Sequence, residues 1–253
     1  MRDALASHPS GRPRHGVLPQ MPALARPRWP RLSRRLMITA GIFLAAFILL
    51  TILVLAGAFT TLDLRLTDYL QHRGSYGQDL GLGLFAYLGS IEVTLLVAVL
   101  LGFALFRGLR LLAVLPVAFI LVASGLEALG KQLLPIPAPP HALNRFPEIL
   151  PALTHNVGFY SYPSGHVLRA TVAYGLVLYL AERWDLFGEN SSRLSPVLVV
   201  ATFLIGYGVV YLGWHWFSDA VGGLLLGLTL LFGLIAYLER KRTVNPGHTQ
   251  ALD

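Results

Sequence analysis

Two short stretches of this sequence carry residues capable of proton transfer and nucleophilic attack, and each stands beside long apolar runs. The first is the segment Tyr162-Pro163-Ser164-Gly165-His166. The second follows further along, as Gly213-Trp214-His215-Trp216-Phe217-Ser218-Asp219. Histidine and aspartate are common acid, base and nucleophile groups in enzymes. The pattern therefore favours a reaction that uses two histidines.

The first stretch is suited to binding an anion. Proline and serine at a helix start leave the first backbone N–H groups pointing out of the helix end, which is a favourable place for phosphate. Gly165 has no side chain to keep a ligand away from the backbone. His166 brings an ionisable ring to the same place. Taken alone, the same four residues are equally typical of an ordinary helix cap with an incidental histidine.

The second stretch predicts an oriented nucleophile. His215 and Asp219 are four residues apart at a helix start, so the carboxylate can accept a hydrogen bond from one ring nitrogen and leave the other free to attack. His166 would then be the acid that protonates the departing oxygen. Lys131 and the N–H groups around Ser164 and Gly165 would offset the charge of a transferring phosphoryl group.

Blander interpretations of the second stretch stay open. His215 and Asp219 are also typical of a helix cap, and Trp214 and Trp216 are typical of an aromatic belt at a membrane interface. A zinc site is disfavoured, because no pair of histidines has the spacing of the usual helical zinc motif. We expect no metal.

Charged residues inside the apolar runs add to the site. Such residues are costly in a membrane and are usually paired or functional. Glu127 and Lys131 are four residues apart, in the order that favours a salt bridge. Arg169 follows His166 by three residues, which puts both on one helix face. An ion pair between Arg169 and either Glu92 or Glu127 is a structural alternative that is compatible with ligand binding.

The composition indicates a protein that crosses a membrane several times. Of the 253 residues, 55% are hydrophobic and only 13% are charged, and the mean hydropathy is +0.61. Apolar runs long enough to span a bilayer recur along the chain. Cysteine is absent, which excludes disulfides, thiolate metal sites and cysteine nucleophiles.

The elements that must position these residues are six predicted helical spans, which together form one all-α membrane bundle at 36–238. A basic tail, rich in proline and arginine and predicted to be disordered, precedes it at 1–35, and a short tail follows at 239–253. The polar segment 60–79 is expected to be a connection. The Pro-rich segment 135–162 is the longest internal break, which suggests a lid. The spans are approximately 36–59, 80–106, 111–134, 164–181, 196–213 and 217–238.

The distribution of positive charge predicts the orientation of the chain. With six spans, fifteen of the twenty Lys and Arg residues fall on the side of the termini, which is therefore expected to be cytoplasmic. His166, His215 and Lys131 would then gather at the extracytoplasmic face of a plasma membrane. The net charge of +7 could suggest nucleic acid, but its placement favours membrane orientation instead. No nucleic-acid partner is expected, and the oligomeric state is open.

This arrangement resembles the membrane branch of the type 2 phosphatidic acid phosphatase (PAP2) and vanadium haloperoxidase superfamily. Its pattern is Lys-x6-Arg-Pro, Pro-Ser-Gly-His and Ser-Arg-x5-His-x3-Asp. Lys131 opens the first part, 163–166 is the whole second part, and His215 with Asp219 closes the third. The resemblance covers about 80–238. It implies a lipid phosphatase with a phosphohistidine at His215, oriented by Asp219, with His166 as the acid and no metal or other cofactor.

Two arginines of the family pattern are missing. Their positions fall on Ala138 and Val209. Each lost charge-assisted contact would remove about 1.5–3 kcal/mol of phosphate binding. Three explanations fit: Arg169 and Arg145 replace the lost charge, the substrate is a singly charged lipid phosphodiester whose headgroup is transferred, or the protein is a catalytically weak lipid-binding bundle. Because two unexplained arginines lie on the correct side, we expect the first.

Overall fold

A computed structural model describes residues 30–106, 113–145, 159–184 and 191–244. The regular elements in these ranges are all helices. They are α1 (Pro30–Leu55), α2 (Thr60–Gln71), α3 (Tyr76–Leu88), α4 (Ile91–Phe106), α5 (Leu115–Leu133), the short 3-10 helix η2 (His141–Leu143), α6 (Gly165–Trp184), α7 (Ser191–Tyr211) and α8 (Phe217–Val244).

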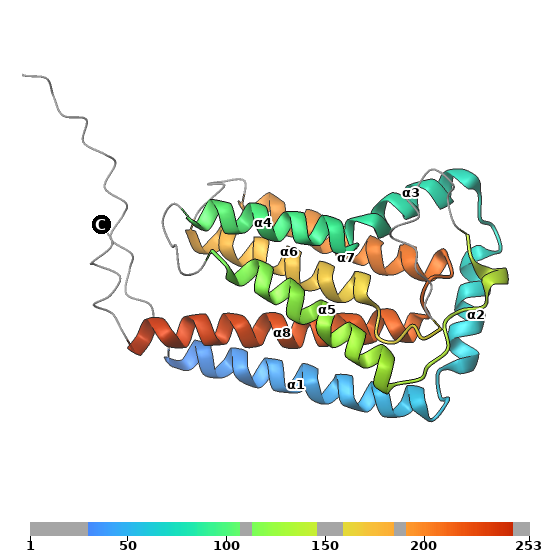
Figure 1. Cartoon of the computed structure of the whole chain (residues 1–253), viewed down its shortest axis with the longest axis horizontal. Coiled ribbons are helices and arrows are strands. Elements are labelled where there is room, and N and C mark those ends of the chain that lie inside the picture. Colours follow the sequence, from blue (N-terminus) through green and yellow to red (C-terminus); the bar gives the residue numbers. More distant parts are fainter. Residues whose placement is uncertain (1–29, 107–112, 146–158, 185–190, 245–253) are drawn as a thin grey trace, which may run out of the picture.

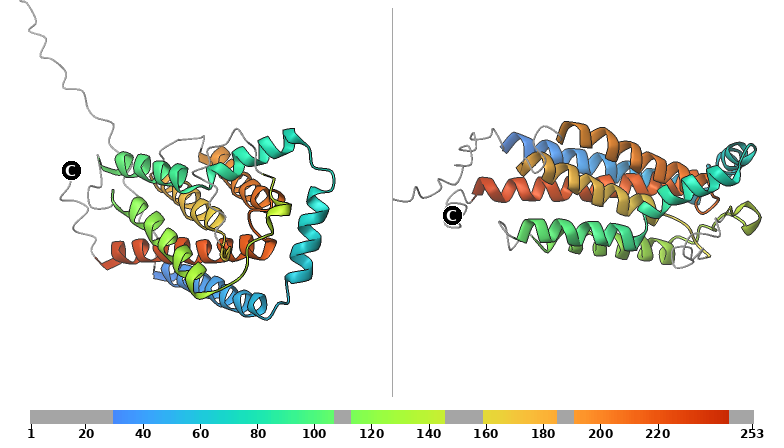
Figure 2. Two further views of the ribbon diagram at one scale, coloured as in Figure 1. Left: turned by 45° about the vertical axis from the view of Figure 1, so that its right-hand side comes forward. Right: turned by 90° about the horizontal axis from the view of Figure 1, so that it is seen from above.

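The long helices run side by side as a bundle with α6 among them (Figure 1). α1 packs along α8, and α6 contacts α5, α7 and α8. Seen from above, α4 and α5 form a layer beside the remaining long helices (Figure 2). The start of α1 and the end of α8 lie at one end of the bundle, whereas α6 and α8 both begin at the other end (Figure 1).

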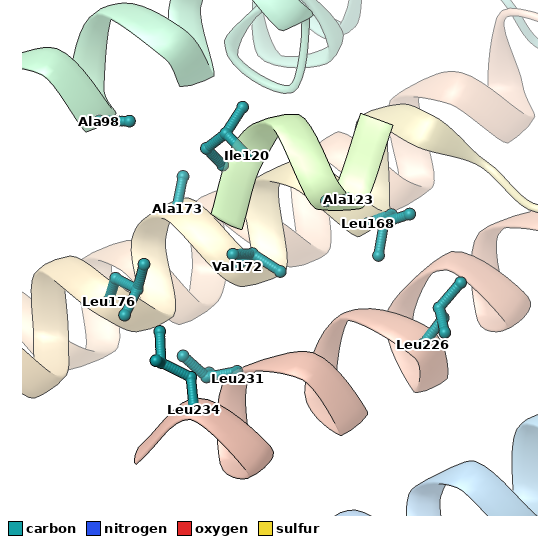
Figure 3. Close-up of a cluster of buried hydrophobic side chains, with 10 residues drawn as sticks. All are labelled: Ala98, Ile120, Ala123, Leu168, Val172, Ala173, Leu176, Leu226, Leu231 and Leu234. Carbon is teal, nitrogen blue, oxygen red and sulfur yellow. The ribbon is translucent and has the colours of Figure 1, made fainter. Parts of the chain in front are cut away.

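The centre of the bundle is an apolar cluster that fixes the position of α6. Figure 3 shows one face of α6 packed between α5 on one side and α8 on the other. Burial of these side chains stabilises the bundle through close packing, because lipid tails are as apolar as the core itself. The cluster contains Ala98, Ile120, Ala123, Leu168, Val172, Ala173, Leu176, Leu226, Leu231 and Leu234.

The predicted all-α membrane bundle is confirmed, and five of the six predicted spans at most pass as candidate membrane spans among the described helices. α1, α5, α7 and α8 are each long and apolar enough to cross a membrane. α3 and α4 meet at an angle of 45° and together pass as one more span. The sixth, α6, carries His166 and Arg169 and is more polar, and it buries most of its first three turns inside the protein.

The expected boundaries change at two places among the described residues. α1 begins at Pro30, so residues 30–35 of the expected disordered tail are helical, and residues 1–29 lie outside the described ranges. Proline suits this first helical position because the first N–H of a helix has no internal partner. α8 continues to Val244, into the expected C-terminal tail. Much of the predicted lid, 146–158, is not described either.

The segment 60–79, expected to be a polar connection, is mostly helical. It forms α2, followed by the first turn of α3. α2 runs across the end of the bundle where α6 and α8 begin (Figures 1 and 2). Its polar residues Asp63 and Thr67 point inward and are buried.

Candidate active site

The start of α6 is held against the start of α8. The backbone N–H of Ser164 donates a hydrogen bond of 3.0 Å to the carbonyl oxygen of Asp219. Ser164 is fully buried, and its hydroxyl has no hydrogen-bond partner among the described residues. A buried, unsatisfied hydroxyl is costly, and at a helix N-terminus it is well placed to receive a ligand.

His215 is fixed by the turn between α7 and α8. Gly213 has φ 68°, in the left-handed region that glycine adopts freely. The N–H groups of Trp214 and His215 then both donate to the carbonyl of Val209, at 3.0 and 3.1 Å, and cap the end of α7. This turn delivers the buried His215 to the end of the bundle where α6 begins.

Asp219 faces His215 as the sequence predicted. The Nδ1 atom of His215 lies 3.4 Å from Oδ2 of Asp219, which is longer than a well-formed hydrogen bond. The same carboxylate oxygen accepts the backbone N–H of Trp216 at 2.9 Å. Asp219 is completely buried. Catalytic hydrogen bonds are often long without substrate and shorten when it binds.

His166 and His215 are brought together. Their ring centroids are 6.0 Å apart, and the rings meet edge to face at 64°. Trp214 lies on another side of His166, with centroids 5.9 Å apart. Trp214 is only 5% exposed, so it packs within the protein and is not part of an interfacial aromatic belt. Trp216 donates its indole N–H to the carbonyl oxygen of Pro137, 2.9 Å away.

Two predicted phosphate-binding cations converge on one carboxylate. Lys131 donates to Oε1 of Glu127 at 2.7 Å, and Arg169 pairs with Oε2 of the same residue. Both ion pairs that the sequence offered as structural alternatives are therefore present. Arg169 is buried, and its Nε atom has no hydrogen-bond partner in the described parts of the chain.

Gly165 lies directly against this carboxylate. A Cβ atom placed on Gly165 would be 2.0 Å from the carboxyl carbon of Glu127. Glu127 is also within electrostatic range of His215. The structure thus groups Lys131, Gly165 and Arg169 around one negatively charged side chain at the start of α6.

Arg145 is held by a different carboxylate. It makes two hydrogen bonds with Asp79, from Nε at 2.7 Å and from Nη2 at 3.0 Å. The hydroxyl of Tyr211 also donates to Asp79, at 2.7 Å, and the guanidinium of Arg145 lies 5.5 Å from the Tyr211 ring centroid. These contacts join the segment after α5 to α3 and α7, and none of them involves Lys131 or the two histidines.

The positions of the missing family arginines are occupied by small or apolar residues in folded surroundings. Val209 is completely buried in an apolar cluster of α3, α6 and α7 side chains. Ala138 donates its backbone N–H to the carbonyl of Phe159 at 3.1 Å. Neither position can supply a cation. The described cations that lie at the start of α6 are Lys131 and Arg169.

The fold and the site together define a helical membrane protein with paired histidines beside a helix N-terminus. The chain belongs to the PAP2 superfamily, since the model of that family matches residues 107–243.

Two curated relatives and one solved structure are similar to the chain. Phosphatidylglycerophosphatase B of Bacillus subtilis (strain 168) is 34% identical over 96 residues, which are 38% of this chain and 46% of the relative. Undecaprenyl-diphosphatase of Sulfolobus acidocaldarius is 32% identical over 73 residues, 29% of this chain and 31% of the relative. The chain thus matches less than half the length of each.

The solved structure supports the fold over a much longer range. It is the crystal structure of a transmembrane PAP2 type phosphatidylglycerolphosphate phosphatase from Bacillus subtilis. Its TM-score against this chain is 0.68 at 22% identity, covering 80% of this chain and 96% of the solved one.

Proposed function

We propose that this protein is an integral membrane lipid phosphatase that hydrolyses a lipid phosphomonoester or pyrophosphate through a phosphohistidine intermediate. The observation that carries the proposal is the 6.0 Å separation of the His166 and His215 rings beside the start of α6. Membership of the PAP2 superfamily agrees with it. The names of the two relatives suggest phosphatidylglycerol phosphate and polyprenyl diphosphate as first candidates, with phosphatidic acid as a third.

In the first step, His215 attacks the phosphorus atom. Asp219 holds Nδ1 of the ring, so that the lone pair of Nε2 forms the new P–N bond. The bond between phosphorus and the lipid oxygen breaks, and His166 gives its proton to that leaving oxygen. The Ser164 hydroxyl, the N–H groups around Gly165, and Lys131 with Arg169 stabilise the charge on the phosphoryl oxygens.

In the second step, water releases the phosphate. The neutral His166 takes a proton from the water, whose oxygen attacks phosphorus while the P–N bond to His215 breaks. Both histidines return to their starting protonation states. The reaction is a double displacement in which this chain supplies the nucleophile, the acid and base, and the phosphate contacts.

A second candidate is transfer of a lipid phosphodiester headgroup. The observation that favours it is Glu127, which leaves the start of α6 with less positive charge than Lys131 and Arg169 alone would provide. A singly charged phosphodiester needs less charge compensation than a phosphomonoester. Headgroup transfer would place the headgroup on an acceptor lipid without release of free phosphate. A catalytically weak lipid-binding protein, the third alternative, would bind lipid equally well without either histidine.

We further propose a plasma-membrane location with cytoplasmic termini and an extracytoplasmic site. The support is the excess of Lys and Arg near the termini. The start of α1 and the end of α8 also lie together, at the opposite end of the bundle from the starts of α6 and α8 (Figure 1). The lipid chain would enter between helices, because such a substrate already lies in the bilayer.

The test is His215→Ala in the full-length protein, assayed for phosphate release from a panel of lipid phosphates. Loss of release with an unchanged elution profile and thermal unfolding temperature is expected. His72→Ala is the matched control, because His72 is exposed at the end of α2 and makes no catalytic contact in this proposal. Retained phosphate release in His215→Ala would overturn the mechanism.

A further inference from the structure

Glu127 occupies the place where a phosphate group is expected. Its carboxylate accepts a hydrogen bond from Lys131 at 2.7 Å and pairs with Arg169, and it lies against Gly165 at the N-terminus of α6. An oxyanion of a substrate would seek these same three partners. A carboxylate and a phosphate share this preference, because both present negatively charged oxygens to donors.

The carboxylate is held firmly in this place. Its side chain is 14% exposed, and the Arg169 side chain is 7% exposed. Glu127 comes from α5, whereas Gly165 and Arg169 come from α6, so the ion pair joins the two helices across their interface. Glu92, by contrast, is exposed, in the first turn of α4.

The charge balance follows directly. Lys131 and Arg169 contribute two positive charges at the start of α6, and Glu127 removes one of them. Val209 and Ala138 add none at the positions where the family pattern has arginine. The net charge of this site is therefore about one positive charge, which does not balance a doubly charged phosphate. The phosphate would also have to displace the Glu127 carboxylate or bind close to it, and like charges repel.

We propose that Glu127 is a specificity-determining residue, an internal anion that phosphate must displace from Lys131 and Arg169, and that it lowers the preference of the site for phosphomonoesters over phosphodiesters. It weakens binding of dianionic phosphate, including inorganic phosphate released by the reaction. This inference rests on the proposed function in one respect, since it takes the start of α6 as the phosphate site.

Glu127→Gln tests the proposal because it removes the charge and keeps the shape. The amide oxygen still accepts a hydrogen bond from one of Lys131 and Arg169, whereas the amide NH2 group offers the other cation no acceptor and leaves it available to phosphate. The dissociation constant of inorganic phosphate, measured by calorimetry on the full-length protein in detergent at pH 8, should fall by about tenfold or more. The free energy of a tenfold change is only a small share of the attraction between unit charges at contact. The ratio of kcat/KM for a phosphomonoester to that for a phosphodiester should rise.

Glu92→Gln is the matched control. It removes the same charge from the membrane domain without touching either cation, so phosphate binding should stay as in the unsubstituted protein. Unchanged or weaker phosphate binding in a folded Glu127→Gln variant would overturn the proposal and leave Glu127 as an ion-pair partner only. If Glu127→Gln does not fold, Glu127→Asp replaces it: the shorter carboxylate reaches both cations poorly, and unchanged phosphate binding there would equally overturn the proposal.

The binding measurement separates this inference from the proposed function. Phosphate binding is recorded without turnover, so it answers the question about Glu127 even in a protein that releases no phosphate. Loss of turnover in His215→Ala, by contrast, stands whatever the Glu127 variants show. Tighter phosphate in Glu127→Gln with full activity in His215→Ala would support the anion site and reject the phosphohistidine.

Discussion

Asp63 and Ser218 join the crossing helix α2 to the start of α8 through two hydrogen bonds. The backbone N–H of Ser218 donates to Oδ1 at 2.9 Å, and its hydroxyl donates to Oδ2 at 2.7 Å. Both residues are buried, and Ser218 directly precedes the Asp219 that faces His215. An acidic side chain at a helix N-terminus satisfies its free N–H groups and suits its dipole. α2 thus helps to hold the candidate site in place.

This contact predicts a pH dependence of stability. Burial raises the pKa of the Asp63 carboxyl above its value in the unfolded chain, although the Ser218 hydrogen bonds oppose the change. The folded protein then binds this proton more tightly than the unfolded protein does. Stability from this residue is fully present below the unfolded pKa and is lost as the pH rises through the folded pKa.

Asp63→Asn should remove that component. The amide can still accept from the Ser218 backbone and donate to its hydroxyl, but it does not titrate. Apparent unfolding temperatures in detergent, measured from about pH 4 to pH 8 across the ordinary and raised range of an aspartate, should be similar for the two proteins at low pH. As the pH rises, the unfolding temperature of the unsubstituted protein should fall relative to that of the variant. A curve parallel to that of the unsubstituted protein would show that Asp63 carries no part of the dependence. Asp68→Asn is the control, since Asp68 is exposed on the same helix.

The second prediction concerns Gly223, which lies at the contact between α8 and α6. A Cβ atom there would lie 2.4 Å from the carbonyl oxygen of Ser164, which is backbone and cannot move aside cheaply. Gly223→Ala should therefore displace the start of α6 and destabilise the folded protein by about 1–3 kcal/mol, which lowers the unfolding temperature. The displaced helix start should also lower kcat. Gly233→Ala is the control on the same helix, because nothing lies within 4 Å of its Cβ position. Equal behaviour of the two variants would contradict this prediction.

The sequence was sufficient to place the two histidines together for a simple reason. Each lies at the beginning of a predicted span, and the spans alternate in direction, so both starts fall at one end of the bundle. Helix boundaries with Pro163 and Gly213 are marked by residue types that begin or end helices. The position of Asp219 relative to His215 follows from helical periodicity alone.

Other features depend on packing that no local pattern records. The position of Glu127 over Gly165 depends on how α5 crosses α6, and the sequence predicted its ion pairs but not this contact. Arg145 was expected at the phosphate, yet the fold brings it to Asp79, 66 residues away in the chain. The helix α2 was not predicted, and its buried Asp63 contacts Ser218, which lies 155 residues away in the chain. The role of each site residue stays a prediction.

Arg145 gives a third prediction. Since Asp79 accepts two hydrogen bonds from Arg145, Arg145→Gln should lower stability by about 1 kcal/mol, as partly exposed ion pairs usually contribute little more. Asp79→Asn should lower it by a similar amount. If Arg145 acts only through this contact, the two variants should also have similar kcat/KM values on a lipid phosphate. A much larger loss of kcat/KM in Arg145→Gln alone would show that Arg145 leaves Asp79 to bind phosphate.

The proposed orientation of the chain in the membrane can be tested by labelling introduced cysteines, because the chain has no cysteine of its own. A single cysteine introduced at either end of the bundle is the only thiol in the chain. His72→Cys, exposed at the end of α2, should react with a membrane-impermeant maleimide added to intact cells. Arg193→Cys, exposed near the start of α7, should react only after the membrane is permeabilised. The reverse pattern would place the histidines on the cytoplasmic side.

Arg169 separates a structural role from a role in binding phosphate. Arg169→Ala leaves the Glu127 carboxylate with Lys131 alone, and breaking a buried ion pair in this way costs about 3–5 kcal/mol. Loss of one charge-assisted phosphate contact of about 1.5–3 kcal/mol should lower kcat/KM by about tenfold to a hundredfold. In the double variant Arg169→Ala with Glu127→Gln, no unpaired carboxylate is left. The unfolding temperature should therefore recover while kcat/KM stays low. Recovery of both would mean that Arg169 serves only to neutralise Glu127.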